Sequence, residues 1–401
     1  MLAIFVALAL RTSRAAPPAT MVDIFTSGTS ANPWSLGKAV AYRIPSLVTT
    51  TAAAAAVAAA DGTAGTLLLA FASERLSGAS DESNTNLVMR RSADGGATWS
   101  NMTLVVSAEV RPPFAPKTTY LSSAPWAVAD AVTGDVLLFY NQNSTEGVAC
   151  ACSVWRVRSS DGGRTWSAPA MLPTASGVLG SSLNSGITLR AGPHKGRLLM
   201  CMRRICKNSC PGPWQSFAAY SDDRGATWQA SPYLEEGSTE CQLAELAAPP
   251  GAVYMAIRPY KELLVRSGGK RASAVSADGG ATWGPVGFEP QLANAGGVDG
   301  SVVSAGAAAD GSSASSGTLF FSHPDAGGRS NMTLYTSRDD AQTWAPTVDV
   351  YSGGAAYSSL AMLAPAPAGS AGAEQAACRV GLAFEKDGYK SIAFAAMAVA
   401  C

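Results

Sequence analysis

Eight residues spread over most of the chain have side chains suited to the chemistry of an anionic ligand. Arginine stays charged, and its planar guanidinium offers a bidentate fork to a carboxylate or a phosphate. Tyrosine and carboxylate side chains beside such a ligand can transfer protons or act as nucleophiles. The eight residues are Arg43, Arg75, Asp81, Glu240, Arg258, Arg329, Tyr357 and Glu385.

The elements that must position these residues are pairs of apolar runs separated by a turn, the pattern of β-hairpins. Six hairpins predict an all-β fold, a six-bladed β-propeller of four-stranded antiparallel sheets. The six pairs are "YRIPSLVTT" with "GTLLLAFASE", "APWAVAD" with "GDVLLFYNQ", "SGITLR" with "GRLLMCMRR", "ECQLAEL" with "GAVYMAIRP", "GSVVSAG" with "GTLFFSHPD", and "YSSLAMLAP" with "CRVGLAFEKD".

An eight-residue stretch containing an aspartate follows five of the hairpins. It reads "SADGGATW" at Ser92 and Ser276, "SSDGGRTW" at Ser159, "SDDRGATW" at Ser221 and "SRDDAQTW" at Ser337. The starts are 67, 62, 55 and 61 residues apart, which is typical of propeller blades with loop insertions. Because Asp, Gly and Thr suit a tight turn, we expect each box between the third and fourth strands of a blade, with its Trp between neighbouring blades.

Strand direction sorts these features between two faces of the expected propeller. Antiparallel strands alternate in direction, so the start of a first strand and the end of a second strand share one face. Arg43, Glu240 and Tyr357 stand at starts, and the other five candidates stand at or just beyond ends. One arginine at a strand end is ordinarily a surface residue, but this combination on one rim favours a ligand site. The box aspartates fall on the opposite face, which favours a structural role: Asp94, Asp161, Asp223 and Asp278.

The N-terminal region makes two predictions. Residues 1–20 hold an apolar run followed by small residues and predict a secretory signal peptide, although no Lys or Arg precedes the run. The alternative is a buried first strand. The segment "MVDIFTSG" that follows is expected to complete the sixth blade, whose hairpin has no box after it, and so to remove a free edge. Residues 21–401 would then form a single propeller domain.

Composition narrows the classes of partner. Lys plus Arg equals Asp plus Glu at 29 each, so no overall charge favours nucleic acid or an anionic membrane. No segment supplies about 20 uninterrupted apolar residues for a membrane span. Eight cysteines fit disulfides in an oxidising compartment, whereas the absence of a Cys-x-x-Cys pair and the presence of only two histidines argue against zinc.

The low-complexity stretches "TAAAAAVAAADGTAG", "AAADGSSASSG" and "APAPAGSAGAEQAA" each separate the two strands of a hairpin and are interpreted as loop expansions.

Six motifs, together with the aspartate boxes, resemble the exo-α-sialidase (neuraminidase) family from about Met21 to the C-terminus. They are "YRIP" from Tyr42, "ASERLSGASDE" from Ala72, "ECQLAEL" from Glu240, "GRSNMTL" from Gly328, "AYSSL" from Ala356 and "FEKDGYKSI" from Phe384. The resemblance implies that three arginines, Arg43, Arg258 and Arg329, hold the carboxylate of sialic acid. It further implies Tyr357 as nucleophile, Glu240 as its partner, Asp81 as acid/base, Glu385 as the acid that braces Arg43, and Arg75 in support.

The activity implied is hydrolysis of terminal α-linked sialic or related nonulosonic acids, with retention of configuration through a tyrosyl-enzyme intermediate. The substrates would be sialylated glycoproteins, glycolipids and oligosaccharides, with no cofactor and no metal, in the secretory pathway, outside the cell or in the lysosome. A tyrosine suits this reaction because the carboxylate on the anomeric carbon would repel an anionic nucleophile. The alternatives are a trans-sialidase, which has the same site, and a non-catalytic propeller that binds sialic acid.

Two departures from the family pattern bear on specificity. Ala124 and Pro125 stand where relatives often have Asn-Pro, which puts one contact to the sugar in doubt. Met202 and Arg203 stand where aromatic residues are common. This second departure predicts altered recognition of the sugar's glycerol chain or of the aglycone; the alternative is that both residues face another blade.

Overall fold

The computed structural model describes residues 20–28, 39–50, 66–81, 83–108, 119–121, 124–144, 153–173, 180–204, 213–307, 317–364 and 377–401. These ranges consist mainly of β-strands, joined by turns and by a few short helical segments: α2 (Lys261–Arg266), η2 (Ala295–Gly297) and η3 (Ala305–Ala307). The predicted signal peptide, apart from Thr20, and most of the three low-complexity stretches lie outside the described residues.

Within the described ranges, four sheets follow one another along the chain before the C-terminal sheet. The first contains β2 (Ala41–Thr50), β3 (Leu67–Arg75), β4 (Thr85–Ser92) and β5 (Thr103–Val106). The second contains β7 (Trp126–Ala129), β8 (Val136–Ser144), β9 (Ser153–Ser159) and β10 (Ala170–Met171), with β6 (Thr119–Leu121) and β11 (Asn184–Ser185) added. The third contains β12 (Ile187–Thr188), β13 (Leu198–Arg203), β14 (Ser216–Ser221) and β15 (Gln229–Ala230). The fourth contains β16 (Ser238–Glu245), β17 (Val253–Pro259), β18 (Lys270–Ser276) and β19 (Gly287–Ala293).

The C-terminal sheet has seven strands because one long strand belongs to two neighbouring arrays. Its members are β20 (Ser301–Ser304), β21 (Leu319–Pro324), β22 (Ser330–Ser337), β23 (Ala345–Met362), β24 (Ala377–Lys386), β25 (Ser391–Ala400) and β1 (Met21–Thr26). The first part of β23 pairs with β22, up to Gly354, and the part from Ala355 onward pairs with β24. The sequence pattern did not predict this continuous strand.

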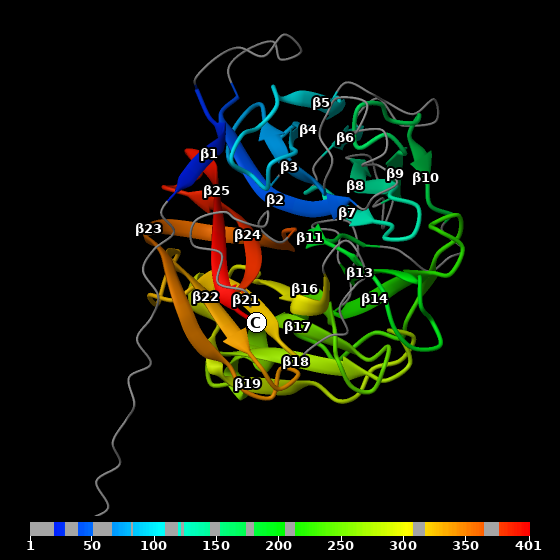
Figure 1. The fold of residues 1–401 in the computed structure, drawn as a ribbon, viewed down its shortest axis with the longest axis vertical. Coiled ribbons are helices and arrows are strands. Elements are labelled where there is room, and N and C mark those ends of the chain that lie inside the picture. The colour runs from blue at the N-terminus through cyan, green and yellow to red at the C-terminus, as the bar shows by residue number, and fades with distance from the viewer. Residues whose placement is uncertain are drawn as a thin grey trace, which may run out of the picture.

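All six predicted hairpins are present as antiparallel pairs, β2–β3, β7–β8, β12–β13, β16–β17, β20–β21 and β23–β24. The expected pairing of the N-terminal segment with the last sheet is also confirmed, because β1 pairs antiparallel with β25. Figure 1 shows the sheets arranged in succession around the molecule in a propeller-like manner, so that red β25 returns beside blue β1. A cavity of about 120 Å³ lies among inner strands and is lined by residues that include Leu47, Ala129, Ile187, Leu243, Val302 and Leu360.

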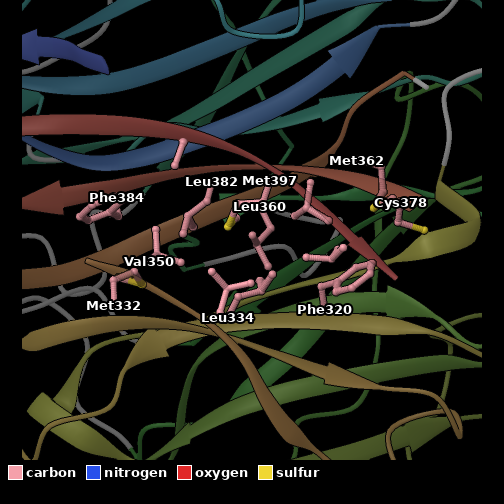
Figure 2. Close-up of a cluster of buried hydrophobic side chains, with 14 of the residues drawn as sticks. Phe320, Met332, Leu334, Val350, Leu360, Met362, Cys378, Leu382, Phe384 and Met397 are labelled. Carbon is pink, nitrogen blue, oxygen red and sulfur yellow. The ribbon is translucent and has the colours of Figure 1, made fainter. Parts of the chain in front are cut away.

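The core lies between successive sheets, which explains why strands such as β3 are apolar at consecutive positions. Every residue of β3 is buried, because both faces of its sheet are covered by neighbouring sheets. Figure 2 shows one such layer, in which Phe320 and Leu334 face Leu360 and Leu382. Burial of this kind stabilises the fold by roughly 25 cal/mol per Å² of apolar surface removed from water.

The aspartate boxes are turns that fasten neighbouring sheets together. In the first box, Asp94 Oδ1 accepts hydrogen bonds from the Thr98 backbone N–H at 2.9 Å and the Ser92 hydroxyl at 2.8 Å. The same pattern recurs at Asp161, Asp223, Asp278 and Asp339. Four of the five box tryptophans pack on an aromatic residue of the adjacent sheet, as Trp99 does on Phe394 at 5.1 Å between ring centroids. The last box keeps this geometry although Ala341 adopts the positive φ of 67° that glycine would favour.

Strand register places the first box at the end of the sheet away from the candidate residues. Arg75 pairs with Thr85 at one end of the β3–β4 ladder, and Leu68 pairs with Ser92 at the other. Seven residues of strand separate these ends, or about 23 Å. The expectation that Asp94 lies far from Arg43 and Arg75 is therefore confirmed.

The substitution Asp94→Asn is expected to lower the Tm by about 1–4 °C, because an amide cannot accept all the hydrogen bonds that Asp94 receives. Burial alone would raise the pKa of Asp94, but hydrogen bonds from Thr98 and Ser92 hold it below its usual value. The stabilisation is therefore present at neutral pH and lost on acidification. Thermal unfolding across pH tests this, and turnover that falls while the Tm stays unchanged would contradict a structural role.

Candidate active site

Three candidate residues lie at irregularities in the inner strands. The register shifts between Arg43 and Ser46 on β2, between Ser238 and Cys241 on β16, and between Ala355 and Ser358 on β23. These shifts fall at Arg43, Glu240 and Tyr357, the residues expected at the starts of first strands. A β-bulge bends a strand and changes the direction of a side chain, and bulges are common beside active sites.

The bulge on β2 contains a strained residue. Ile44 has a φ of 53°, a left-handed conformation that a β-branched residue rarely adopts. Its backbone N–H donates to Glu385 Oε1 at 2.9 Å, which holds the strained backbone in place. Strain of this size, about 1–3 kcal/mol, persists only where the surrounding contacts fix the backbone.

The phenol of Tyr357 and the carboxylate of Glu240 form the centre of the site. The Tyr357 hydroxyl lies 3.0 Å from both Oε1 and Oε2 of Glu240, and both residues are buried. Arg258 Nη1 donates to Glu240 Oε2 at 2.5 Å and lies 3.3 Å from the Tyr357 hydroxyl. Arg203 Nη1 donates to the other carboxylate oxygen at 2.9 Å. A phenol, its potential base and two cations are thus in direct contact.

The electrostatics of this pair fit a proton-accepting carboxylate beside a phenol. Burial raises the pKa of Tyr357 well above its usual value, and the charge of Glu240 raises it further. Burial would also raise the pKa of Glu240, but the charges of Arg258 and Arg203 outweigh it and hold that pKa below the usual range. The carboxylate is therefore available as a base, and the phenol needs that base in order to react.

Arg43 is held by carboxylates on two sides. Its Nε lies 3.0 Å from Glu385 Oε1, and its Nη1 lies 3.1 Å from Asp81 Oδ1. Burial would lower the pKa of Arg43, but Glu385 and then Asp81 raise it above the usual value. Glu385 also accepts from the Tyr357 backbone N–H at 3.3 Å, so one buried carboxylate orients both residues.

Asp81 is the exposed acid of the site, with a side chain that is 58% exposed. Arg75, which is almost completely buried, reaches its Oδ1 at 3.4 Å and also donates to the Ser80 carbonyl at 2.6 Å. Burial lowers the pKa of Arg75 to about 10. Arg75 therefore fixes the loop that presents Asp81.

Arg329 lies in the turn between β21 and β22 and reaches the same group of side chains. Its Nε donates to the Gly296 carbonyl at 3.2 Å, its Nη1 donates to the Tyr389 hydroxyl, and its guanidinium lies 5.8 Å from the Tyr357 ring centroid. The Tyr389 ring in turn lies 4.2 Å from the guanidinium carbon of Arg43. All eight candidates are thereby linked in one network of contacts.

Sequence reasoning missed two contributors to this network. Tyr389 lies inside the quoted motif "FEKDGYKSI" but was given no role, although it joins Arg43 to Arg329. The second contributor is the turn Ala295–Gly297, for which the sequence signal is the pair of consecutive glycines. Both glycines adopt a positive φ, which allows a close approach of backbone. A Cβ on Gly296 would lie 2.9 Å from Arg329 Cγ.

The residues that depart from the family pattern lie in different surroundings. Met202 is fully buried in the core between sheets, as the alternative interpretation expected. Arg203, next to it, instead reaches the Glu240 carboxylate. Ala124 packs in the cluster around Tyr357, where it offers no polar group to a sugar.

The described residues contain no group of three or more His, Cys, Asp or Glu side chains arranged to hold a metal ion. Within the same part of the chain, no helix is long and apolar enough to cross a membrane. Two disulfides lie within the described residues, Cys201–Cys241 between β13 and β16 and Cys378–Cys401 near the C-terminus. The other four cysteines lie outside the described ranges.

The chain matches one known family model and is similar to several known proteins. The family model described as a BNR repeat-like domain matches residues 22–366. A sialidase of Micromonospora viridifaciens is 30% identical over 339 residues, covering 80% of this chain and 48% of that protein. Human sialidase-4 is 29% identical over 278 residues, covering 62% of this chain and 50% of that protein. The chain thus spans about half the length of these two relatives.

A solved structure extends the likeness to the fold. The Hadza microbial sialidase Hz136 superposes with a TM-score of 0.67 at 24% identity, covering 89% of this chain and 66% of that one. At this level of identity the likeness concerns the fold alone.

Proposed function

The chain belongs to the sialidase family of BNR repeat-like domains, and from that premise we propose that it is an exo-α-sialidase. It would release terminal α-linked sialic or related nonulosonic acids from glycans, with retention of configuration. The observation that carries this proposal is the contact of 3.0 Å between the Tyr357 hydroxyl and the Glu240 carboxylate, beside Arg258. A binding protein would not need a nucleophile joined to a base.

The substrate carboxylate would bind to Arg43, Arg258 and Arg329. Their guanidinium groups stay charged and can each offer two parallel N–H donors to a carboxylate. Asp81 contacts Arg43 in this structure, so the incoming sugar carboxylate would compete with Asp81 for that arginine. Binding would then direct Asp81 toward the glycosidic oxygen.

Tyr357 would attack the anomeric carbon while Glu240 accepts the phenolic proton. A neutral phenol avoids the repulsion that the substrate carboxylate would exert on an anionic nucleophile. Asp81 would donate a proton to the leaving glycosidic oxygen, and the tyrosyl-enzyme bond would form as the glycosidic bond breaks. In the second step Asp81 would accept a proton from water as the water oxygen attacks the anomeric carbon, and Glu240 would return its proton to the departing Tyr357 oxygen, with net retention.

The fold proposed for this catalytic domain is a six-bladed propeller over residues 21–401. Support comes from β23, which serves as the outer strand of one array and the inner strand of the next. Counting that strand twice divides the seven-stranded sheet into two four-stranded blades, the second completed by β1. The cavity lining draws on six inner strands, β2, β7, β12, β16, β20 and β23, one from each proposed blade.

The proposed substrates are sialylated glycoproteins, glycolipids and oligosaccharides, and the proposed location is the secretory pathway, with secretion or lysosomal delivery. Residues 1–20 would direct the chain there. Two disulfides within the described ranges support an oxidising compartment.

Gly296→Ala is expected to raise the KM for a sialoside about tenfold with little change in kcat, because the added Cβ would displace Arg329 and weaken one charged contact to the carboxylate. Gly268→Ala is the matched control. Gly268 also has a positive φ, of 60°, but a Cβ there would meet open space. Steady-state kinetics on both variants test this, and equal effects of the two substitutions would contradict a role for the turn.

The direct test of the activity is release of free sugar from a panel of fluorogenic glycosides carrying N-acetyl, N-glycolyl and deaminated nonulosonic acids. We expect release from at least one of them, and none from the Tyr357→Phe protein. Product analysis with added lactose separates hydrolysis from transfer to a galactose acceptor. Binding without release from any glycoside would replace the proposal with a sialic-acid-binding function.

A further inference from the structure

Glu240 receives hydrogen bonds from two arginines that come from different sheets. Arg258 on β17 donates to Oε2 at 2.5 Å, and Arg203 on β13 donates to Oε1 at 2.9 Å. The Tyr357 hydroxyl lies 3.0 Å from each oxygen. Arg258 belongs to the arginines proposed to hold the substrate carboxylate, whereas Arg203 has no assigned role in the proposed reaction.

Arg203 is itself fixed on several sides. Its Nε donates to the Ser181 hydroxyl at 2.7 Å, and its backbone N–H donates to the Ser181 carbonyl at 2.8 Å. Its guanidinium carbon lies 5.5 Å from the Trp214 ring centroid, within the range of a cation–π contact. The side chain is only 22% exposed. A guanidinium held in this way presents its remaining N–H groups in one geometry.

A disulfide joins the strands that carry the two partners. Cys201 precedes Arg203 by two residues on β13, and Cys241 directly follows Glu240 on β16. The bond between them sets the separation of these strands beside the Arg203–Glu240 contact. Strands from two different sheets are thus tied together at the position of the ion pair.

We propose that Arg203 is a positioning residue for the nucleophile pair, holding the Glu240 carboxylate against the Tyr357 hydroxyl through the oxygen that Arg258 does not contact. This inference rests on the proposed function of Tyr357 and Glu240. When the substrate carboxylate draws on Arg258, Arg203 keeps Glu240 in place. The proton of Tyr357 then has a base in the correct orientation throughout the attack.

The charges around Glu240 fix the direction of the pH effect. The groups that act on it are Arg203, Arg258, Tyr357 and the buried Asp299 and Arg271. Arg203 is one of the cations that lower the pKa of Glu240, so its removal raises that pKa. Glu240 accepts a proton only in its ionised form, which predominates above its pKa. The acidic limb of the pH profile must therefore move to higher pH when Arg203 is replaced.

The test compares Arg203→Gln with Arg204→Gln on an aryl sialoside. Arg204 is the adjacent arginine, but its side chain donates to Gln215 and stacks on Tyr233. We expect Arg203→Gln to lower kcat about 10- to 100-fold, since a hydrogen bond to a charged group is lost, with KM within about twofold. Its acidic limb should move to higher pH. Arg203→Lys should recover part of kcat, and Arg204→Gln should match the unaltered protein.

Two results would overturn the inference. One is a kcat for Arg203→Gln equal to that of Arg204→Gln. The other is a rise in KM at unchanged kcat, which would make Arg203 a substrate contact instead. If Arg203→Gln does not fold, Arg203→Lys provides the same comparison of kcat, KM and pH profile against Arg204→Lys.

A measurement without substrate separates this inference from the proposed function. The titration of Glu240 is followed by NMR in protein with ¹³C-labelled glutamate carboxyls, with the signal assigned by its loss in Glu240→Gln. A higher pKa in Arg203→Gln than in Arg204→Gln supports the inference even if no sugar is released. Identical titrations would overturn it even if the protein is an active sialidase.

Discussion

Tyr357→Phe is expected to lower kcat for an aryl sialoside by at least about 10³-fold, because it removes the oxygen that forms the covalent intermediate. The Tm should stay within about 3 °C, since the ring remains in its buried site and Glu240 keeps hydrogen bonds to Arg258 and Arg203. Initial rates and thermal unfolding on the same preparation provide the measurement.

Tyr351→Phe is the matched control for this substitution. Tyr351 lies on the same strand, and its hydroxyl also donates to a carboxylate, that of Asp387, at 2.7 Å. Loss of that hydroxyl should leave kcat within about twofold. Substantial turnover by Tyr357→Phe, or an equal loss in both variants, would exclude Tyr357 as the nucleophile.

Asp81→Ala is expected to produce a loss that depends on the leaving group. General acid catalysis contributes about 10²–10⁴-fold, and a sugar alcohol needs that proton far more than an acidic phenol does. We expect kcat/KM for sialyllactose to fall about 10³-fold, with a fall of less than about tenfold for an activated aryl sialoside. Parallel assays on the two substrates measure the difference.

Asp81→Asn serves as the companion variant, because it keeps the size of the side chain but cannot supply the proton. The exposed position of Asp81 predicts unchanged stability for both substitutions. Equal losses on the two substrates would contradict the acid role. They would indicate that Asp81 acts on substrate binding or on Arg43.

The sheets could be predicted from the sequence because their signals are local. Apolar runs flanked by turn residues identified β3, and the repeated box fixed the position of β4 relative to the turn at Asp94. The continuity of β23 could not be predicted in this way. It depends on Gly353, Gly354 and their neighbours staying extended between two arrays, and sequence patterns suggest a break there.

The candidate site likewise has a part that local sequence signals predict and a part that they do not. Strand direction alone was enough to bring residues as distant as Arg43 and Tyr357 to one rim, because each needs only its own hairpin to be placed. The contacts of Arg203 with Glu240 and of Tyr389 with Arg43 and Arg329 join different sheets. Such contacts depend on bulges and on strained residues such as Ile44, and a single sequence carries little signal for either.

The central claim, a covalent bond between Tyr357 and the sugar, is tested most directly with a 2,3-difluoro sialic acid. Attack by the Tyr357 oxygen would expel the fluoride on the anomeric carbon, and the second fluorine would slow hydrolysis of the adduct. Peptide mass spectrometry is then predicted to show the added 3-fluoro-sialyl mass on Tyr357 and none in Tyr357→Phe. A label on another residue, or no label in a protein that hydrolyses sialosides, would contradict the account.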